Sequence, residues 1–288
     1  MSKAAVRAIR FFEAVSGTGL RGNMTAKFFS GLLKLIHPRY KVMDSNMLIA
    51  YPDSSEQWRK DMIRKCYEHL GWTIAEILAL QRDPSQVFNW IKRRHNDSMM
   101  EKVLAEKKGA LFLSGHIGNW ELLSSWYAQY ALKHGHKLNI VYQELHDKDV
   151  WEYVREIRER SGQVLLPKKM SVQKYAHMLK DGMHLALLDD ISGHPNMKVP
   201  FMGHQATNIP GPAVMALLSG VPVIPVCSYR IAPFEHEMFF LDPIKIPDKN
   251  ENHEDRVKLT VQAINDALEI LIRKHPEQWF WLHRRWRP

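Results

Sequence analysis

Cysteine is scarce in this chain, and its few cysteines form no cluster. The 288 residues include two cysteines, Cys66 and Cys227, which lie far apart in apolar surroundings. We expect both to be reduced core thiols, because an isolated cysteine usually behaves as a small apolar side chain. The CxxC spacing of structural metal sites is also missing. The sequence therefore predicts no structural zinc ion.

Long apolar runs are absent as well. No stretch of about 18 consecutive apolar residues occurs, so the sequence predicts no transmembrane helix. The basic start is not followed by a long apolar region and a small-residue cleavage site, so we expect no signal peptide. These absences favour a protein that stays on the cytoplasmic side, either soluble or peripheral to a membrane.

Acidic residues are rare in residues 1–41, where eight lysines and arginines face a single acid, Glu13. Apolar side chains, among them Phe11, Phe12, Phe28 and Phe29, recur there at helical spacing. A basic amphipathic helix is typical of a membrane surface, but it is equally typical of a helix packed on its own domain. A basic arm also fits nucleic acid or an acidic partner. Because no helix-turn-helix, RRM or zinc-finger pattern is present, we do not expect nucleic acid.

The rest of the chain, residues 42–288, is interpreted as a single domain with a helical lead-in (42–107) and an α/β core (108–288). In the lead-in we expect helices over residues 44–51, from a Ser54 or Ser55 cap to about Leu80, and over 84–91. In the core, strands are predicted over residues 110–114, 138–142, 163–166, 184–188 and 222–229. They alternate with predicted helices over residues 119–133, 147–161, 170–181, 211–219 and 255–274. This alternation predicts an αβα sandwich with a mostly parallel central sheet.

The most informative segment is Ala110 to Glu121, in which His116 follows a short apolar strand and Glu121 falls in the next helix. Sites in parallel sheets form beyond the carboxyl ends of strands, where Asp189 also lies. An ionised Glu121 near a helix N-terminus is favoured by the helix dipole, and it could orient the imidazole as a base. The pair alone is weak, because a structural histidine is the common alternative. No Gly-x-Ser-x-Gly elbow is present, so we favour direct activation of a substrate hydroxyl over an acyl-enzyme.

Several spaced blocks then resemble the bacterial lipid A biosynthesis acyltransferases, within the wider lysophospholipid and glycerolipid acyltransferase superfamily. The segment 115–121 resembles their HxxxxE/D block, and Asp190 stands where the family usually has Gln or His. The further blocks are Asn46 to Pro52, Arg158 to Ser161, Asp189-Asp190 with Gly193, Val199 to Gly203 with Ala206-Thr207, and Trp281 to Trp286. The resemblance covers roughly residues 40–288.

The resemblance implies acyl transfer from a thioester, usually acyl–acyl carrier protein, to a hydroxyl of a lipid. His116 would take the hydroxyl proton while Glu121 holds the ring. Backbone N–H groups around residues 201–203, including Gly203, would stabilise the oxyanion. No metal or cofactor is implied, because a thioester is already activated.

Arg158 and Arg160 would bind phosphate or carboxylate groups of the acceptor, although both also fit solvated helix charges. Asp189 and Thr207 are further candidates for substrate binding, each with a structural alternative. The basic, aromatic C-terminus, with Arg285 and Arg287, would meet the membrane or the carrier protein, or form core.

The expected acceptor is a lipid A precursor or a related glycolipid. Other membrane lipids (a phosphoinositol mannoside, an aminolipid or a lysophospholipid) and an esterase or thioesterase activity stay open as alternatives. The expected partners are the acyl–carrier protein, the membrane glycolipid and an anionic membrane surface. We expect a peripheral location at the cytoplasmic face of the bacterial inner membrane.

Overall fold

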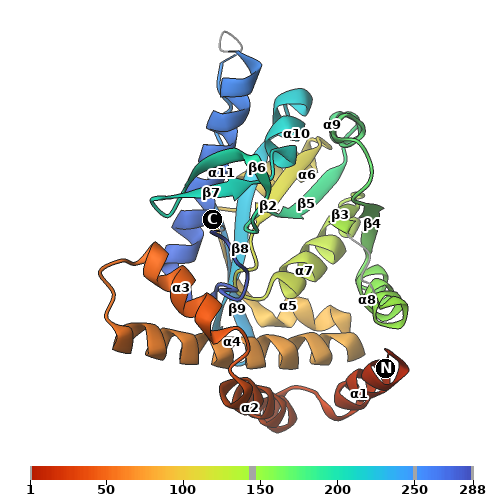
Figure 1. Cartoon of the computed structure of the whole chain (residues 1–288). Coiled ribbons are helices and arrows are strands. Elements are labelled where there is room, and N and C mark those ends of the chain that lie inside the picture. Colours follow the sequence, from red (N-terminus) through yellow and green to blue (C-terminus); the bar gives the residue numbers. More distant parts are fainter. Residues whose placement is uncertain (1, 143–146, 249–251, 287–288) are drawn as a thin grey trace.

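The computed structural model describes residues 2–142, 147–248 and 252–286. A seven-stranded sheet in the order β1-β9-β8-β2-β5-β3-β4 forms its centre (Figure 1). Neighbouring strands are parallel except β8 and β9, which pair antiparallel. The strands are β1 (Ile91–His95), β2 (Ala110–Ser114), β3 (Leu138–Tyr142), β4 (Gln163–Pro167), β5 (His184–Leu188), β8 (Val223–Ala232) and β9 (Glu235–Phe240). The predicted α/β architecture with a mostly parallel sheet is confirmed.

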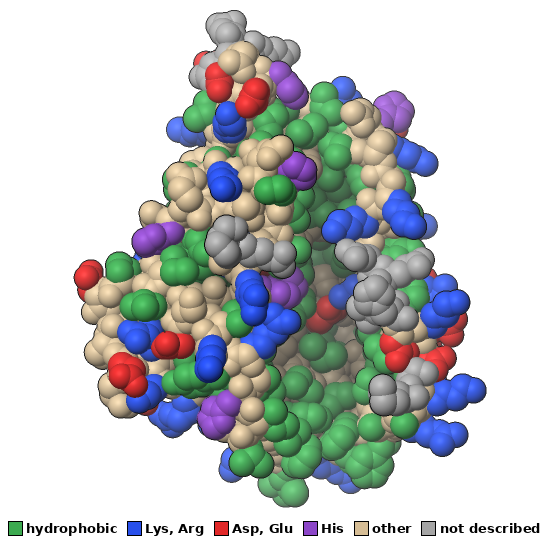
Figure 2. All heavy atoms as spheres, viewed as in Figure 1, with side chains coloured by type: hydrophobic (Ala, Val, Ile, Leu, Met, Phe, Trp, Pro, Cys, Tyr) green, Lys and Arg blue, Asp and Glu red, His purple; other side chains and the backbone are tan. Residues whose placement is uncertain are grey.

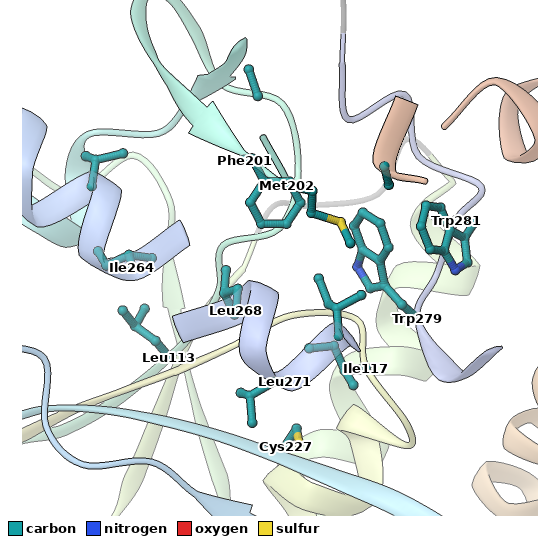
Figure 3. Close-up of a cluster of buried hydrophobic side chains, with 14 of the residues drawn as sticks. Leu113, Ile117, Phe201, Met202, Cys227, Ile264, Leu268, Leu271, Trp279 and Trp281 are labelled. Atoms are coloured by element: carbon teal, nitrogen blue, oxygen red, sulfur yellow. The ribbon is translucent and has the colours of Figure 1, made fainter. Parts of the chain in front are cut away.

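Helices cover both faces of the sheet, because strand side chains alternate between two apolar clusters. On one face, Phe112 and Val226 pack with α5 (Val87–Trp90), α6 (Ser98–Ala105) and α7 (Trp120–Lys133). On the other face, Leu111 and Leu113 pack with α9 (Val172–Lys180), α10 (Gly211–Ser219) and α11 (His253–Lys274). Figure 3 shows the second cluster where α11 meets Trp279 and Trp281. Helix α8 (Lys148–Arg160) packs beside β4, at the edge of the sheet.

The N-terminal helices lie across one end of this sandwich (Figure 1). They are α1 (Ser2–Val15), α2 (Gly19–Ile36), α3 (Tyr40–Ala50) and α4 (Glu56–Arg82). Helix α2 packs along α4, and α1 contacts both α4 and α8. Ser55 caps α4 by accepting a hydrogen bond from the Trp58 backbone N–H, as one of the two predicted caps. The chain therefore brings its basic arm onto the domain.

Four strands were not anticipated. The lead-in was expected to be helical, but β1 lies within it, and β9 completes that side of the sheet. Strands β6 (His194–Phe201) and β7 (His204–Asn208) form a separate antiparallel hairpin. The helix predicted over residues 84–91 is a 3₁₀ turn (Pro84–Gln86) followed by α5, and a second 3₁₀ turn spans Pro276–Gln278.

The strands separate at the end of the sheet where the predicted site lies. The β3–β5 ladder ends at the pair Ile140 and Ala186, whereas β3 stays paired with β4 as far as Tyr142. Beyond that point β5 continues beside β2 to Leu188. The gap between the two strands is available for a cavity at the carboxyl end of the sheet.

Candidate active site

His116 lies in the loop that joins β2 to α7, as its position after an apolar strand predicts. The Asn119 side chain caps α7 by accepting a hydrogen bond from the Leu122 backbone N–H at 3.0 Å. Gly118 has a φ of +59°, and a Cβ at this position would lie 1.5 Å from the carbonyl oxygen of Ser228. The loop thus needs glycine both for its conformation and for its close approach to β8. This backbone holds His116 at the carboxyl end of the sheet.

Asp190, two residues beyond the end of β5, orients the His116 ring. Its Oδ1 lies 2.8 Å from His116 Nδ1, and its Oδ2 accepts the His116 backbone N–H at 2.7 Å. The Trp279 indole N–H donates to the same Oδ2 at 2.8 Å. Burial alone would raise the pKa of this carboxyl, but the His116 charge and these donors outweigh it and lower the pKa to about 2. Asp190 is therefore a buried carboxylate.

The contact with Asp190 also sets the protonation state of the histidine. Burial alone would lower the pKa of His116, but the charge of Asp190 and its hydrogen bond outweigh burial and raise that pKa above its usual value. A carboxylate accepts only hydrogen bonds, so Nδ1 carries the proton that points at Asp190. The other nitrogen, Nε2, is then the lone-pair atom of the neutral ring. This is the arrangement of a general base with its orienting partner.

Glu121 lies in the first turn of α7 as predicted, but it does not hold the imidazole. Its carboxylate binds Arg158 of α8, with Arg158 Nη2 at 2.6 Å from Oε1 and Nε at 3.3 Å from Oε2. The expected orienting contact from Glu121 is therefore wrong. Asp190 contacts Nδ1 of His116, and Glu121 instead forms a bidentate ion pair with Arg158 of α8. The negative charge of Glu121 still raises the pKa of His116, after the effects of Asp190.

Aromatic rings surround His116. The ring centroids of Trp120, Phe280 and His283 lie 5.0, 5.9 and 5.1 Å from that of His116. Burial and the positive charges nearby, His116 first among them, lower the pKa of His283. Asp190, Phe280 and His283 were not among the predicted site residues. Asp190 and His283 belong to the Asp189-Asp190 and Trp281 to Trp286 blocks, whereas Phe280 lies one residue before the C-terminal block.

His116 borders a cavity of about 520 Å³. Residues of β3 and β5 near the point where these two strands separate also line it. Glu121, Arg158, Lys168 and Asp189 are charged residues that line it together with His116. Its other walls are mostly apolar and include Phe112, Leu123, Tyr127, Leu138, Ile140, Met170, Val172, Leu187 and Met215. A largely apolar ligand fits such a space. In the described parts of the chain, no cluster of His, Cys, Asp and Glu is arranged as a metal site.

Arg285 and Asp189 are two further buried charged residues near Asp190. Arg285 is fully buried and donates to the Thr207 carbonyl oxygen at 2.7 Å and to Asn208 Oδ1 at 2.6 Å. Burial raises the pKa of Asp189 to about 8, against the lowering effect of Arg285. Burial lowers the pKa of Arg285 to about 10. Asp189 thus reaches the cavity, while Thr207 anchors Arg285 through its backbone and does not line the cavity.

Besides Thr207, two predicted site residues lie away from the cavity. Arg160 donates to the Gln81 carbonyl oxygen and to Glu156, and it does not line the cavity. Gly203 forms the exposed turn between β6 and β7, with a φ of +79°. The Met202 backbone N–H donates to Glu269, and Met202 lies beside Trp279 in the apolar cluster (Figure 3). Residues 201–203 do not line the cavity beside His116, and the oxyanion hole expected there stays a prediction. Arg287 lies outside the described residues.

A network of buried charged and polar side chains contacts the loop that carries His116. Glu76 of α4 is fully buried, and Arg230 of β8 binds it through two nitrogens at 2.7 Å each. Glu76 Oε2 also accepts a hydrogen bond from Asn119, the cap of α7. His69 contacts the Gly118 carbonyl oxygen at 3.1 Å. Because buried ion pairs of this kind resist rearrangement, the network fixes the loop on which His116 sits.

The outer face of α1 and α2 carries exposed apolar side chains beside basic ones. The exposed apolar residues there are Phe11, Val15, Leu20, Met24, Phe28, Leu32, Leu35 and Ile36. Figure 2 shows hydrophobic side chains along this edge and upward to a hollow in the middle of the same face. None of the helices formed by the described residues is both long and apolar enough to cross a membrane.

Comparison with known proteins identifies the family of this chain. The family model described as "Bacterial lipid A biosynthesis acyltransferase" matches residues 20–288. The chain belongs to this family. One curated member, the lipid A biosynthesis lauroyltransferase of Escherichia coli (strain K12), is 25% identical over 261 residues, which cover 88% of this chain and 81% of that protein. The family resemblance is thus confirmed, and the chain is an acyltransferase of the lipid A biosynthesis family.

A search of solved structures found the 1-acyl-sn-glycerophosphate acyltransferase PlsC of Thermotoga maritima. It is 14% identical to this chain, with a TM-score of 0.36, and the match covers 88% of this chain and 97% of that one.

Proposed function

We propose that this acyltransferase moves a fatty acyl chain from acyl–acyl carrier protein to a hydroxyl of a lipid A precursor or a related glycolipid. The observation that carries the proposal is the placement of His116: Asp190 holds its ring, and the ring borders a largely apolar cavity of about 520 Å³. A base at the polar end of an apolar cavity brings a proton acceptor next to the head of a bound hydrocarbon chain. Membership of the family supports the reaction class.

The proposed chemistry needs one base and no covalent enzyme intermediate. Nε2 of His116 takes the proton of the acceptor hydroxyl, and the oxygen attacks the carbonyl carbon of the thioester. When the carbon–sulfur bond breaks, the leaving thiolate takes that proton back from the imidazolium. Asp190 stabilises the imidazolium and keeps Nε2 directed at the substrate, as the carboxylate does in catalytic triads. The acyl chain of the donor occupies the apolar part of the cavity.

We assign Arg158 to acceptor recognition. Its guanidinium reaches the cavity beside His116, and Glu121 fixes its orientation through two contacts. A planar guanidinium held in place is well suited to phosphate. Arg160 provides a matched control on the same helix, because it does not line the cavity. Replacement of Arg158 by alanine should raise the KM for a phosphorylated acceptor by about tenfold or more, whereas Arg160→Ala should change it less than twofold.

We further propose that the α1–α2 face lies on the anionic inner-membrane surface, at its cytoplasmic side. Exposed apolar side chains such as Phe28 and Leu35 would enter the interface, and the surrounding lysines and arginines would meet the lipid phosphates. This placement puts the hollow in Figure 2 beside the lipid from which an acceptor would come.

Mass spectrometry of reaction products tests the proposed function. The enzyme is incubated with acyl–carrier protein or acyl–coenzyme A and with a lipid A precursor, a lysophospholipid and a phosphoinositol mannoside in parallel. We expect acylation of the lipid A precursor with the carrier-protein donor. Exclusive acylation of one of the other lipids would overturn the assigned acceptor. Steady release of free fatty acid, with no acylated lipid in any reaction, would indicate a thioesterase instead.

A further inference from the structure

The proposed chemistry has a base for the hydroxyl but no assigned donor for the carbonyl oxygen of the thioester. This oxygen becomes negatively charged when the hydroxyl oxygen attacks the carbonyl carbon, and donors aimed at it usually give the largest stabilisation of the transition state. The turn at residues 201–203, where such donors were expected, does not line the cavity. The side chains around His116 are therefore the next candidates.

The C-terminal segment 278–283 is bonded to the loop that carries His116. The Gly118 backbone N–H donates to the Gln278 carbonyl oxygen at 2.8 Å, and the Phe280 backbone N–H donates to the His116 carbonyl oxygen at 2.9 Å. These two hydrogen bonds fix the position of the segment relative to His116, so the side chains that follow Phe280 come close to the imidazole.

A buried asparagine holds the other end of this segment. Asn46 of α3 is 3% exposed, and its Nδ2 donates to the Trp281 carbonyl oxygen at 2.8 Å and to the His283 carbonyl oxygen at 2.6 Å. One buried amide therefore fixes the backbone of His283 through two hydrogen bonds. A reacting side chain needs such fixed support, because displacements of about 1 Å in an active site are costly for the rate.

The His283 ring lies beside the His116 ring, and no contact within the fold uses its nitrogens. The two ring centroids are 5.1 Å apart, with the ring planes at 63°. Among the described residues neither nitrogen of His283 has a hydrogen-bond partner, and neither is a buried atom, so both are accessible to a ligand. Figure 2 shows a histidine side chain at the rim of the hollow. His283 is thus a polar ring next to the base with no structural hydrogen bond of its own.

The surroundings of His283 favour its neutral form. Burial lowers the pKa of His283, and the charges of His116 and Arg39 lower it further, against the opposing effect of Asp190. A neutral imidazole carries one N–H group, and a neutral imidazole with a lowered pKa can polarise a carbonyl group. When His116 takes up a proton during the attack, its new charge disfavours protonation of His283 further.

The spacing of the two rings suits a carbonyl group beside the base. A hydrogen bond spans about 3 Å, so a carbonyl carbon that meets the hydroxyl at His116 Nε2 can bring its oxygen within reach of a ring 5.1 Å away. We propose that His283 donates an N–H hydrogen bond to the carbonyl oxygen of the thioester and stabilises the oxyanion that forms there. The proton of this N–H stays on His283, and the oxygen becomes the carbonyl oxygen of the product ester when the carbon–sulfur bond breaks. This inference rests on the proposed function, which supplies the thioester.

Two substitutions at the same position test the hydrogen bond. His283→Phe keeps a ring without an N–H donor, whereas His283→Gln keeps an N–H donor without the ring. We expect His283→Phe to lower kcat about 100-fold or more and to change the KM for acyl–carrier protein less than about twofold, as the loss of one oxyanion donor does. His283→Gln should recover about tenfold or more of that loss. Wild-type kcat in His283→Phe, or equal losses in the two variants, would overturn the proposal.

A donor analogue without the carbonyl group separates the transition state from simple packing. The probe is carrier protein whose phosphopantetheine sulfur bears a dodecyl thioether, in which CH₂ replaces C=O. We expect it to inhibit wild type and His283→Phe with inhibition constants within about twofold of each other, because a donor to the oxyanion adds nothing to the binding of this probe. A loss of inhibition that matches the loss of kcat would show that the ring only packs against the donor, and would overturn the proposal.

Trp120 supplies the other side-chain N–H next to His116, at a centroid distance of 5.0 Å. Trp120→Phe removes this donor and keeps an aromatic ring. We expect a smaller loss of kcat in Trp120→Phe than in His283→Phe. The reverse order would assign the oxyanion to the indole and overturn the role of His283.

Release of the carrier-protein thiol, measured beside the acylated lipid, distinguishes a failure of this inference from a failure of the proposed function. Acylation of the lipid A precursor at the wild-type rate by His283→Phe would refute the role of His283 and leave the proposed function standing. Thiol release without any acylated lipid, slowed by His283→Phe and partly restored by His283→Gln, would refute the proposed function and retain the role of His283.

Discussion

Replacement of Asp190 by asparagine removes the charge that orients His116 and keeps the size of the side chain. Asp190 accepts two hydrogen bonds from His116 and one from Trp279. Burial and the charge of Arg158 both lower the pKa of His116, and Asp190 is the main group that opposes them. Without this carboxylate we expect the pKa of His116 to fall below its ordinary value. The acid limb of the pH–rate profile should move to lower pH, because the base must be neutral to act.

The expected losses follow from the same contacts. An asparagine presents its amide N–H₂ or its oxygen to Nδ1 and no longer fixes the tautomer, so turnover should fall by about 10² to 10⁴. The pKa of Asp190 is lowered from 3.8 to about 2 in the fold. That difference stabilises the fold by about 2 kcal/mol at neutral pH. A group with a depressed pKa stabilises the fold above its unfolded pKa. The wild type should therefore lose this stabilisation as the pH falls from about 4 to about 2.

The assay combines pH–rate profiles with an NMR titration of the His116 ring in wild type, Asp190→Asn and Glu121→Gln. We expect the His116 pKa to fall most in Asp190→Asn and less in Glu121→Gln, because Asp190 is the one of these two carboxylates that contacts the imidazole ring. A larger fall in Glu121→Gln, or unchanged turnover in Asp190→Asn, would refute the assignment of Asp190 as the orienting group.

Three further predictions follow from the support of the site and from its surface. Gly118→Ala should destabilise the fold by about 3 kcal/mol or more, measured by urea unfolding, because its Cβ would meet the Ser228 carbonyl oxygen; unchanged stability would contradict this contact. Glu76→Gln should cost about 3 to 5 kcal/mol in the same assay, because it leaves Arg230 buried without its charge partner; a loss below 1 kcal/mol would contradict the network. Leu35→Glu should weaken sedimentation with anionic vesicles severalfold while the melting temperature stays the same, because this side chain is 77% exposed; equal sedimentation would argue against the α1–α2 face as the membrane surface.

Buried strands were predictable, whereas polar and edge strands were not. The sequence predicted residues 110–114, 138–142 and 184–188 with the bounds that the structure has, because parallel strands buried on both faces consist of short apolar runs. Strand β1 (Ile91–His95) lies at the edge of the sheet and contains Lys92, Arg93 and Arg94, so it has no apolar run. The β6–β7 hairpin is held by pairing between its own strands. Pro200 and Gly203 interrupt the alternation of apolar and polar residues that would have predicted these strands.

The position of the base was predictable, but its partner was not. His116 and Asp190 each lie two residues beyond the paired residues Ser114 and Leu188, so the register of β2 against β5 brings them together. That register joins residues 74 positions apart, and no local spacing encodes it. Glu121 was the nearest carboxylate in the sequence, and its place in the first turn of α7 was correct. The position of α8, which gives Glu121 its partner Arg158, depends on packing that a single sequence does not reveal.

The most direct test of the account is the rate of acyl transfer by His116→Ala under single-turnover conditions, with intact-protein mass spectra taken at the same times. The account predicts a folded protein that lacks acyl transfer to the lipid hydroxyl, and a wild type that forms product without any acylated enzyme. Transfer by His116→Ala at close to the wild-type rate, or an acyl adduct that forms and decays on the wild-type enzyme, would contradict it.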